Sequence, residues 1–135
     1  MPQVGFRESS FCPNQVVVRG SFDTNDTNAP DGVRGRLEVT RTGAGVFKCE
    51  LSADPNGPAA AYTQWDSYDV DLHGTNSSNY TVKVTASDAA ITRPYITVTV
   101  YLKTYAVGAI DTYVATDTTD LKVCIQGVLL KAASF

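Results

Sequence analysis

The segment of residues 32–52 constrains the fold of this chain most, because apolar and polar side chains alternate on both sides of a glycine-rich turn, Gly43-Ala44-Gly45. A period of two gives each strand one buried face, and glycine allows the positive φ that a tight turn needs. The segment therefore predicts a β-hairpin, with residues 33–41 paired to residues 46–53. The side chains expected in its core are Leu37, Val39, Phe47, Cys49 and Leu51.

The rest of the chain favours strands as well. It has 135 residues, the length of one domain, and the 43% of apolar residues are largely Val, Tyr, Phe and Ile, accompanied by many Thr. We expect an all-β fold: a single-domain antiparallel β-sandwich or jelly-roll-like barrel of about seven or eight strands over residues 16–135, preceded by an extended N-terminal arm, residues 1–15. Outside the hairpin, the predicted strands are residues 16–22, 62–72, 80–86, 95–105, 112–115 and 121–130.

Two of these strands and the arm suggest contacts beyond one sheet face. The strand at 95–105 carries Tyr95, Tyr101 and Tyr105 on its polar side, where a second layer of the domain or another subunit is expected to cover them. The strand at 121–130 is so apolar that we expect it to be buried on both faces, at the domain centre or at a subunit interface. In the arm, Phe6 and Phe11 either fold back or dock on a neighbour.

Charge and hydropathy narrow the possible partners. The net charge of −3 is spread evenly along the chain, and phosphate neutralisation drives most nucleic-acid binding, so we expect no direct contact with DNA or RNA. The sequence contains no run of about 18 apolar residues, so we expect no membrane span. The first residues lack the basic and apolar regions of a signal peptide, so we expect synthesis in a cytoplasm.

The three cysteines are predicted to be reduced thiols. Cys12, Cys49 and Cys124 form an odd set with no short paired spacing. The alternative is an immunoglobulin-like bridge between Cys49 and Cys124 around Trp65, but Lys122 stands where that pattern places a tyrosine, two residues before the second cysteine.

No catalytic motif is visible, and we expect neither an enzyme nor a cofactor. His73 is the only histidine, and no glycine-flanked serine elbow or phosphate-binding glycine loop accompanies it. Asp69, Asp71 and His73 alternate on one strand face, where a metal site is conceivable, although a solvated face is the favoured interpretation. The oxygen-rich residues 23–32 are likewise interpreted as a polar loop in preference to a calcium loop, so no metal is expected.

Several short sequence segments resemble those of a known group of proteins. RGSFDTN, APDGVRG, VTRTGAGVFKCEL and the closing VCIQGVLLKA are similar to small β-sandwich structural proteins of tailed bacteriophages, of the capsid decoration or cement type. The resemblance implies a virion protein, made in the host cytoplasm, that binds the assembled shell as a homo-oligomer and stabilises contacts between capsomers. Its partners would be the major capsid protein or other virion proteins.

The residues expected to make these contacts combine the arm, the tyrosine strand and the arginines near the hairpin. They are Phe6, Phe11, Arg19, Arg34, Arg36, Arg41, Tyr95, Tyr101 and Tyr105.

Two alternative functions stay open at this point. One is a head-to-tail joining protein. The other is a receptor- or carbohydrate-binding module of a fibre, in which Tyr62, Trp65 and Tyr68 would stack on a sugar while Asp66 and Asp69 accept its hydroxyl hydrogens.

Overall fold

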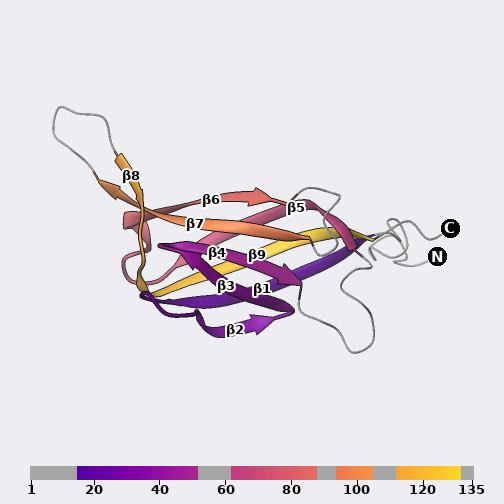
Figure 1. Cartoon of the computed structure of the whole chain (residues 1–135), viewed down its shortest axis with the longest axis horizontal. Helices are drawn as coiled ribbons and strands as arrows, with labels where there is room; N and C mark the ends of the chain where they lie inside the picture. The colour runs from indigo at the N-terminus through magenta and orange to yellow at the C-terminus, as the bar shows by residue number, and fades with distance from the viewer. Residues whose placement is uncertain (1–14, 52–61, 88–93, 105–111, 132–135) are drawn as a thin grey trace, which may run out of the picture.

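Nine β-strands and one 3-10 helix make up most of the chain in the computed structural model, which describes residues 15–51, 62–87, 94–104 and 112–131. The all-β prediction is confirmed (Figure 1). The elements are β1 (Gln15–Asn25), β2 (Asp31–Gly35), β3 (Leu37–Gly43), β4 (Val46–Leu51), β5 (Tyr62–His73), η3 (Ser77–Asn79), β6 (Tyr80–Ala86), β7 (Tyr95–Thr104), β8 (Thr112–Ala115) and β9 (Thr119–Lys131).

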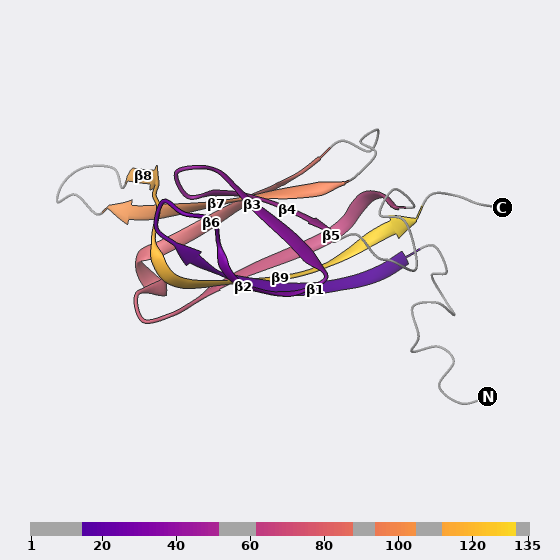
Figure 2. The same cartoon turned by 60° about the horizontal axis from the view of Figure 1, so that its bottom comes forward.

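The strands form two antiparallel sheets packed as a sandwich. The first sheet has the order β2-β1-β9-β5, and the second has the order β3-β4-β7-β6, with β8 paired to β7. Figure 2 shows β1 and β9 running together along one layer while β7 and β6 lie in the other. No helix within the described ranges is long and apolar enough to cross a membrane. We call the outer surfaces of the two sheets the four-strand face and the five-strand face.

The core lies between the sheets and draws side chains from both. Phe22 on β1 and Phe47 on β4 meet across the interlayer space with their ring centroids 5.0 Å apart and their planes tilted by 55°, a geometry that aromatic pairs favour. Both rings are almost completely buried. Around them lie further buried side chains, including Val18, Leu37, Cys49, Leu51, Ile96, Val98, Val100, Val123, Ile125 and Leu129.

The predicted hairpin core is confirmed, but its first strand is divided. Leu37 pairs with Leu51 and Val39 with Cys49, which places the predicted apolar set toward the core. The segment expected as one strand over 33–41 is two strands in different sheets, since β2 pairs with β1 and only β3 pairs with β4. The chain changes sheet at Gly35, whose φ is 85° and whose α-carbon lies against β1. This division gives nine strands where the sequence predicted about seven or eight.

Strand β9 is central in its sheet but, within this chain, buried on one face only, so the prediction of two-sided burial inside the domain is wrong and burial of its second face by another subunit stays a prediction. It lies between β1 and β5. Leu121, Val123 and Ile125 point inward, whereas Lys122 and Gln126 are exposed on the four-strand face. Its outer face combines the exposed polar side chains of Lys122 and Gln126 with the half-buried apolar side chains of Cys124, Val128 and Leu130, which explains why the strand is so apolar in sequence.

The predicted arm, residues 1–15, lies outside the described residues except for Gln15, which begins β1. At the opposite end of the sandwich from the start of β1, the β7–β8 hairpin projects beyond the neighbouring strands (Figure 1). We use the name β7–β8 hairpin for Lys103, Thr104 and β8.

Candidate functional site

The four-strand face brings together polar side chains from distant parts of the sequence. Arg19 on β1 pairs with Gln126 on β9, which pairs in turn with Asp69 on β5. The next row along the strands is Ser21, Cys124 and Asp71. Neighbouring strands are about 4.8 Å apart and successive residues on one face about 7 Å apart, so these two rows form one small polar field.

Two adjoining hollows lie over this field. The first, about 380 Å³, is lined from all four strands and includes Arg34, Gly35 and Asp71 in its wall. The second, about 320 Å³, extends toward Val17, Tyr68 and Val128. Because Arg19, Asp69 and Gln126 line both, the two hollows form one groove across β1, β9 and β5. We call it the sheet groove; each hollow has the size of a small-molecule site.

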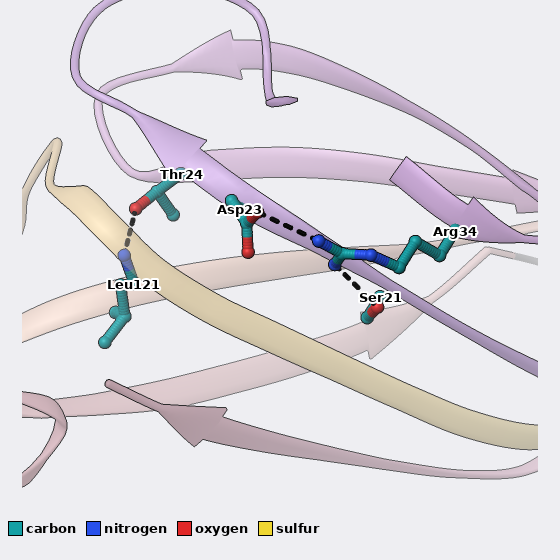
Figure 3. Close-up of polar contacts among 5 residues, drawn as sticks. All are labelled: Ser21, Asp23, Thr24, Arg34 and Leu121. Carbon is teal, nitrogen blue, oxygen red and sulfur yellow. Dashed lines mark hydrogen bonds and ion pairs between the residues drawn. The ribbon is translucent and has the colours of Figure 1, made fainter. Parts of the chain in front are cut away.

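Arg34 closes one side of the sheet groove. Its guanidinium lies 3.4 Å from the Ser21 hydroxyl and 3.4 Å from a carboxylate oxygen of Asp23, so it crosses from β2 onto β1 (Figure 3). The side chain is still 56% exposed, so the ion pair contributes little to stability. Its effect is to cover Ser21 and to fix a cationic wall for the groove.

Arg41 has a different setting, at the turn between β3 and β4. Its guanidinium donates two hydrogen bonds to Asp117, 3.0 Å from Nε to Oδ1 and 2.6 Å from Nη2 to Oδ2, and the Gly45 backbone N–H donates to the same carboxylate at 2.9 Å. The contact fastens the segment between β8 and β9 to the β3–β4 turn. Arg41 was predicted to be a contact residue for a partner, and the structure gives its charged group an internal role.

The Arg41–Asp117 contact makes stability depend on pH. The hydrogen bonds from Arg41, with help from the Gly45 N–H, lower the pKa of Asp117 below its usual 3.8 despite partial burial. A carboxyl with a lowered folded-state pKa stabilises the protein fully above its unfolded pKa, and this contribution is lost as the pH falls through the folded value. We expect Asp117→Asn to lower Tm at pH 7 by a few degrees and to reduce the loss of Tm as the pH is lowered from about 5 to about 2, a range that passes through and below the usual pKa of an aspartate.

Thermal melts of both proteins across that pH range check this prediction. Asp31→Asn, at an exposed carboxylate on β2, is the matched control and should follow the parent protein. Identical pH profiles for parent and Asp117→Asn would show that the contact adds no pH-dependent stability.

A buried hydroxyl pair fixes the start of β9 on β1. The Thr24 and Thr118 hydroxyl oxygens are 2.7 Å apart. The Leu121 backbone N–H donates to the Thr24 hydroxyl at 3.0 Å (Figure 3). Without these hydrogen bonds the buried hydroxyl groups would have no partners. The pair therefore has a structural role: it holds the segment that enters β9 against β1.

The tyrosines predicted as contacts lie on the five-strand face. Tyr95 and Tyr101 are half-buried on β7, and the Lys48 ammonium sits 4.6 Å from the centre of the Tyr95 ring in a cation–π contact. Tyr105 lies outside the described residues. This contact comes from the neighbouring strand β4 of the same sheet, so the predicted cover of the tyrosines by a second layer or another subunit stays a prediction.

Among the described residues, the most exposed large apolar side chains lie on β8, a strand for which no contact was predicted. Tyr113 and Val114 on β8 are 54% and 57% exposed. Adjacent strand residues point to opposite faces, so both sides of the β7–β8 hairpin present an apolar side chain. In the sequence, the only sign of this surface is the Tyr-Val pair between Thr112 and Ala115. The exposure of the two side chains arises because β8 pairs with β7 alone, which local sequence does not reveal.

The predicted contact residues therefore fall into separate groups. Arg19 and Arg34 meet at the sheet groove, and Arg36 is exposed where the chain changes sheet. Tyr95 and Tyr101 lie on the five-strand face, and Arg41 is at the turn between β3 and β4. Phe6 and Phe11 lie outside the described residues. Of the groove residues, Arg19 and Arg34 were predicted as capsid contacts, and Asp69 and Tyr68 as sugar contacts of the alternative fibre module. Gln126 was not predicted as a contact, and Asp71 was considered only for a metal site.

The structure also bears on three other hypotheses from the sequence: sugar stacking on Trp65, a metal site at His73 and the state of the cysteines. Trp65 is 6% exposed and packs against Gly127, so it offers no open ring to a sugar. Asp69, Asp71 and His73 do share a face, but no group of three or more His, Cys, Asp or Glu within the described ranges has a metal-binding arrangement. Cys49 and Cys124 are free thiols, one in the core and one on the four-strand face, and burial raises the pKa of Cys49 to about 12.

No protein-family model, curated protein or solved structure matches the chain significantly.

Proposed function

We propose that the protein is a virion structural protein, a capsid decoration or cement protein that binds the assembled shell and stabilises contacts between capsomers. The proposal starts from the resemblance of several short sequence segments to small β-sandwich structural proteins of tailed bacteriophages. In this proposal it is made in the host cytoplasm, resides in the virion, and contacts the major capsid protein or another virion protein as a homo-oligomer.

The observation that carries the proposal is the β7–β8 hairpin. It projects from the sandwich (Figure 1) and carries the two most exposed of the large apolar side chains in the described chain, Tyr113 and Val114. Tyrosine is enriched at protein interfaces because its ring buries a large apolar area while its hydroxyl finds a polar partner. A projecting ribbon with apolar side chains on both sides can insert between two neighbouring subunits and contact both.

Such a protein would stabilise a shell because many copies of it bind at the same time. A single contact of this size is weak, but a homo-oligomer that engages several capsomers at once gains from the high effective concentration of its remaining sites. Backbone hydrogen bonds between β7 and β8 order the hairpin before it binds, which reduces the conformational entropy that the contact would lose.

Co-sedimentation with capsids that lack the protein tests the proposal. The parent protein should bind with saturation, and the double substitution Tyr113→Ser with Val114→Ser should weaken binding about tenfold or more, as expected when an aromatic anchor is removed. Val33→Ser is the matched control, since Val33 is an apolar residue on β2 that is 41% exposed and distant from the β7–β8 hairpin in sequence.

The outcomes separate two parts of the proposal. Absence of saturable binding by the parent protein would refute the role on the capsid. Saturable binding that the double substitution leaves unchanged would keep the role and reject the β7–β8 hairpin as the contact.

A further inference from the structure

The sheet groove presents hydrogen-bond donors and acceptors in one cross-strand row. Arg19 offers a guanidinium with donors only, Asp69 offers a carboxylate with acceptors only, and Gln126 between them offers both. Asp71 adds a second carboxylate one row along the same strand. The row therefore has a donor end on β1 and an acceptor end on β5, with a mixed group in the middle.

These four side chains are exposed, and within the described residues none of them makes a side-chain hydrogen bond or ion pair. Arg19 and Asp69 are separated by β9 and do not neutralise each other by direct contact. Their hydrogen-bonding capacity is directed at whatever occupies the groove. The two arginines and two aspartates in its wall also cancel in formal charge, so the groove favours a ligand without net charge.

An apolar strip borders this polar row. The second hollow is lined by Val17, which is 36% exposed, and by Tyr68, which is 39% exposed. A ligand that fills both hollows thus meets hydroxyl-binding groups along one part and apolar side chains along another. Sugars combine these properties, since each ring carries hydroxyls that both donate and accept, together with apolar C–H faces.

A peptide would be recognised differently. The backbone groups of β1 and β9 beneath the sheet groove are already paired within the sheet, and strand addition takes place at a sheet edge, whereas the groove lies on the face of the sheet. An anionic ligand would be repelled by Asp69 and Asp71, and a cationic ligand by Arg19 and Arg34.

We propose that the sheet groove is a binding site for a neutral oligosaccharide. Arg19 donates to sugar oxygens, Asp69 and Asp71 accept from sugar hydroxyls, and Gln126 does both, while Val17 and Tyr68 contact the apolar face of a neighbouring ring. This site is separate from the β7–β8 hairpin, so it does not depend on the proposed role on the capsid. A protein held on a shell by its hairpin would have this second surface for attachment to glycans.

Isothermal titration calorimetry with neutral hexasaccharides of glucose, mannose, galactose and N-acetylglucosamine tests this site. At least one probe should bind with saturation, and Arg19→Ala, Asp69→Ala and Gln126→Ala should each weaken that binding about tenfold, as when a charge-assisted or bidentate hydrogen bond is lost. Lys83→Ala, at an exposed lysine on β6 of the other sheet, and Asp31→Ala on β2 are the controls and should bind like the parent protein.

Thermal melts of every variant confirm that the fold is intact, because these side chains are exposed and their removal should change Tm little. The proposal is overturned if none of the four probes binds the parent protein with saturation. It is also overturned if the groove variants bind as well as the controls, or if inorganic phosphate or a basic peptide competes fully for the groove.

Discussion

Leu37→Asp is expected to abolish the cooperative folded state. Leu37 is 4% exposed, at the position where the chain enters the second sheet, and its side chain fills the space beneath Gly20 of β1. The substitution removes a buried aliphatic side chain, which costs about 2–5 kcal/mol, and adds the larger penalty of burying a carboxylate without a partner. Since domains of this size are stable by about 5–15 kcal/mol, circular dichroism should show no native transition.

Arg36→Glu, one residue earlier, is the control for this prediction. Arg36 is exposed, so its charge reversal should leave the thermal transition within a few degrees of the parent protein. If Leu37→Asp melted like the parent, or if both variants were equally damaging, the assignment of core and solvent faces on β3 would be wrong.

Phe22→Ala is expected to produce the second large effect, a loss of about 3–5 kcal/mol in the free energy of unfolding. Phe22 is fully buried and its ring meets Phe47 on the opposite sheet, so truncation leaves a cavity between the layers and ends an aromatic contact across them. Urea denaturation should show a lower midpoint with an unchanged m value.

Tyr113→Ala removes an aromatic ring of similar size from the β7–β8 hairpin and is the matched control. Because Tyr113 is 54% exposed, the change in unfolding free energy should stay within about 0.5 kcal/mol. A similar loss of stability in both variants would mean that the Tyr113 ring is buried within the domain, and it would remove the basis for the proposed capsid contact.

The confirmed parts of the fold are those governed by local alternation. Strands β3 and β4 carry apolar side chains at every second position on both sides of the Ala44-Gly45 turn, so the side chains themselves define a buried face. Strand β6 likewise begins and ends at the predicted residues. In such segments the period of two and the nearby turn residues are sufficient, and no distant part of the chain changes the result.

The predictions that failed depend on long-range pairing. The division between β2 and β3 leaves the polar and apolar alternation almost unbroken, and Gly35 is its main local sign. The two-sided burial predicted for β9 within the domain rested on counting apolar residues, whereas its exposed face is set by its neighbours β1 and β5, which are distant from it in sequence. Trp65 resembled an exposed ring among polar neighbours, and it is buried because Gly127 leaves room for it.

The candidate sites, like the fold, combine features that are visible in the local sequence with features that depend on long-range strand pairing. Arg19 and Arg34 were recognisable as an arginine-rich neighbourhood close to the hairpin, since they are near in sequence. Their opposition to Asp69 and Gln126 comes from the order β2-β1-β9-β5 and its register, which local patterns do not encode. The exposure of Tyr113 likewise depends on the position of β8 at the end of the sheet.

The most direct test of the proposed capsid role is cryo-electron microscopy of capsids that lack the protein, imaged before and after saturation with it. The proposed function predicts new ordered density at fixed positions on the outside of the shell, in which the sandwich fits with the β7–β8 hairpin directed at the contact between neighbouring capsomers. Unchanged shells at saturating protein, or density in which the hairpin end points away from the shell, would contradict it.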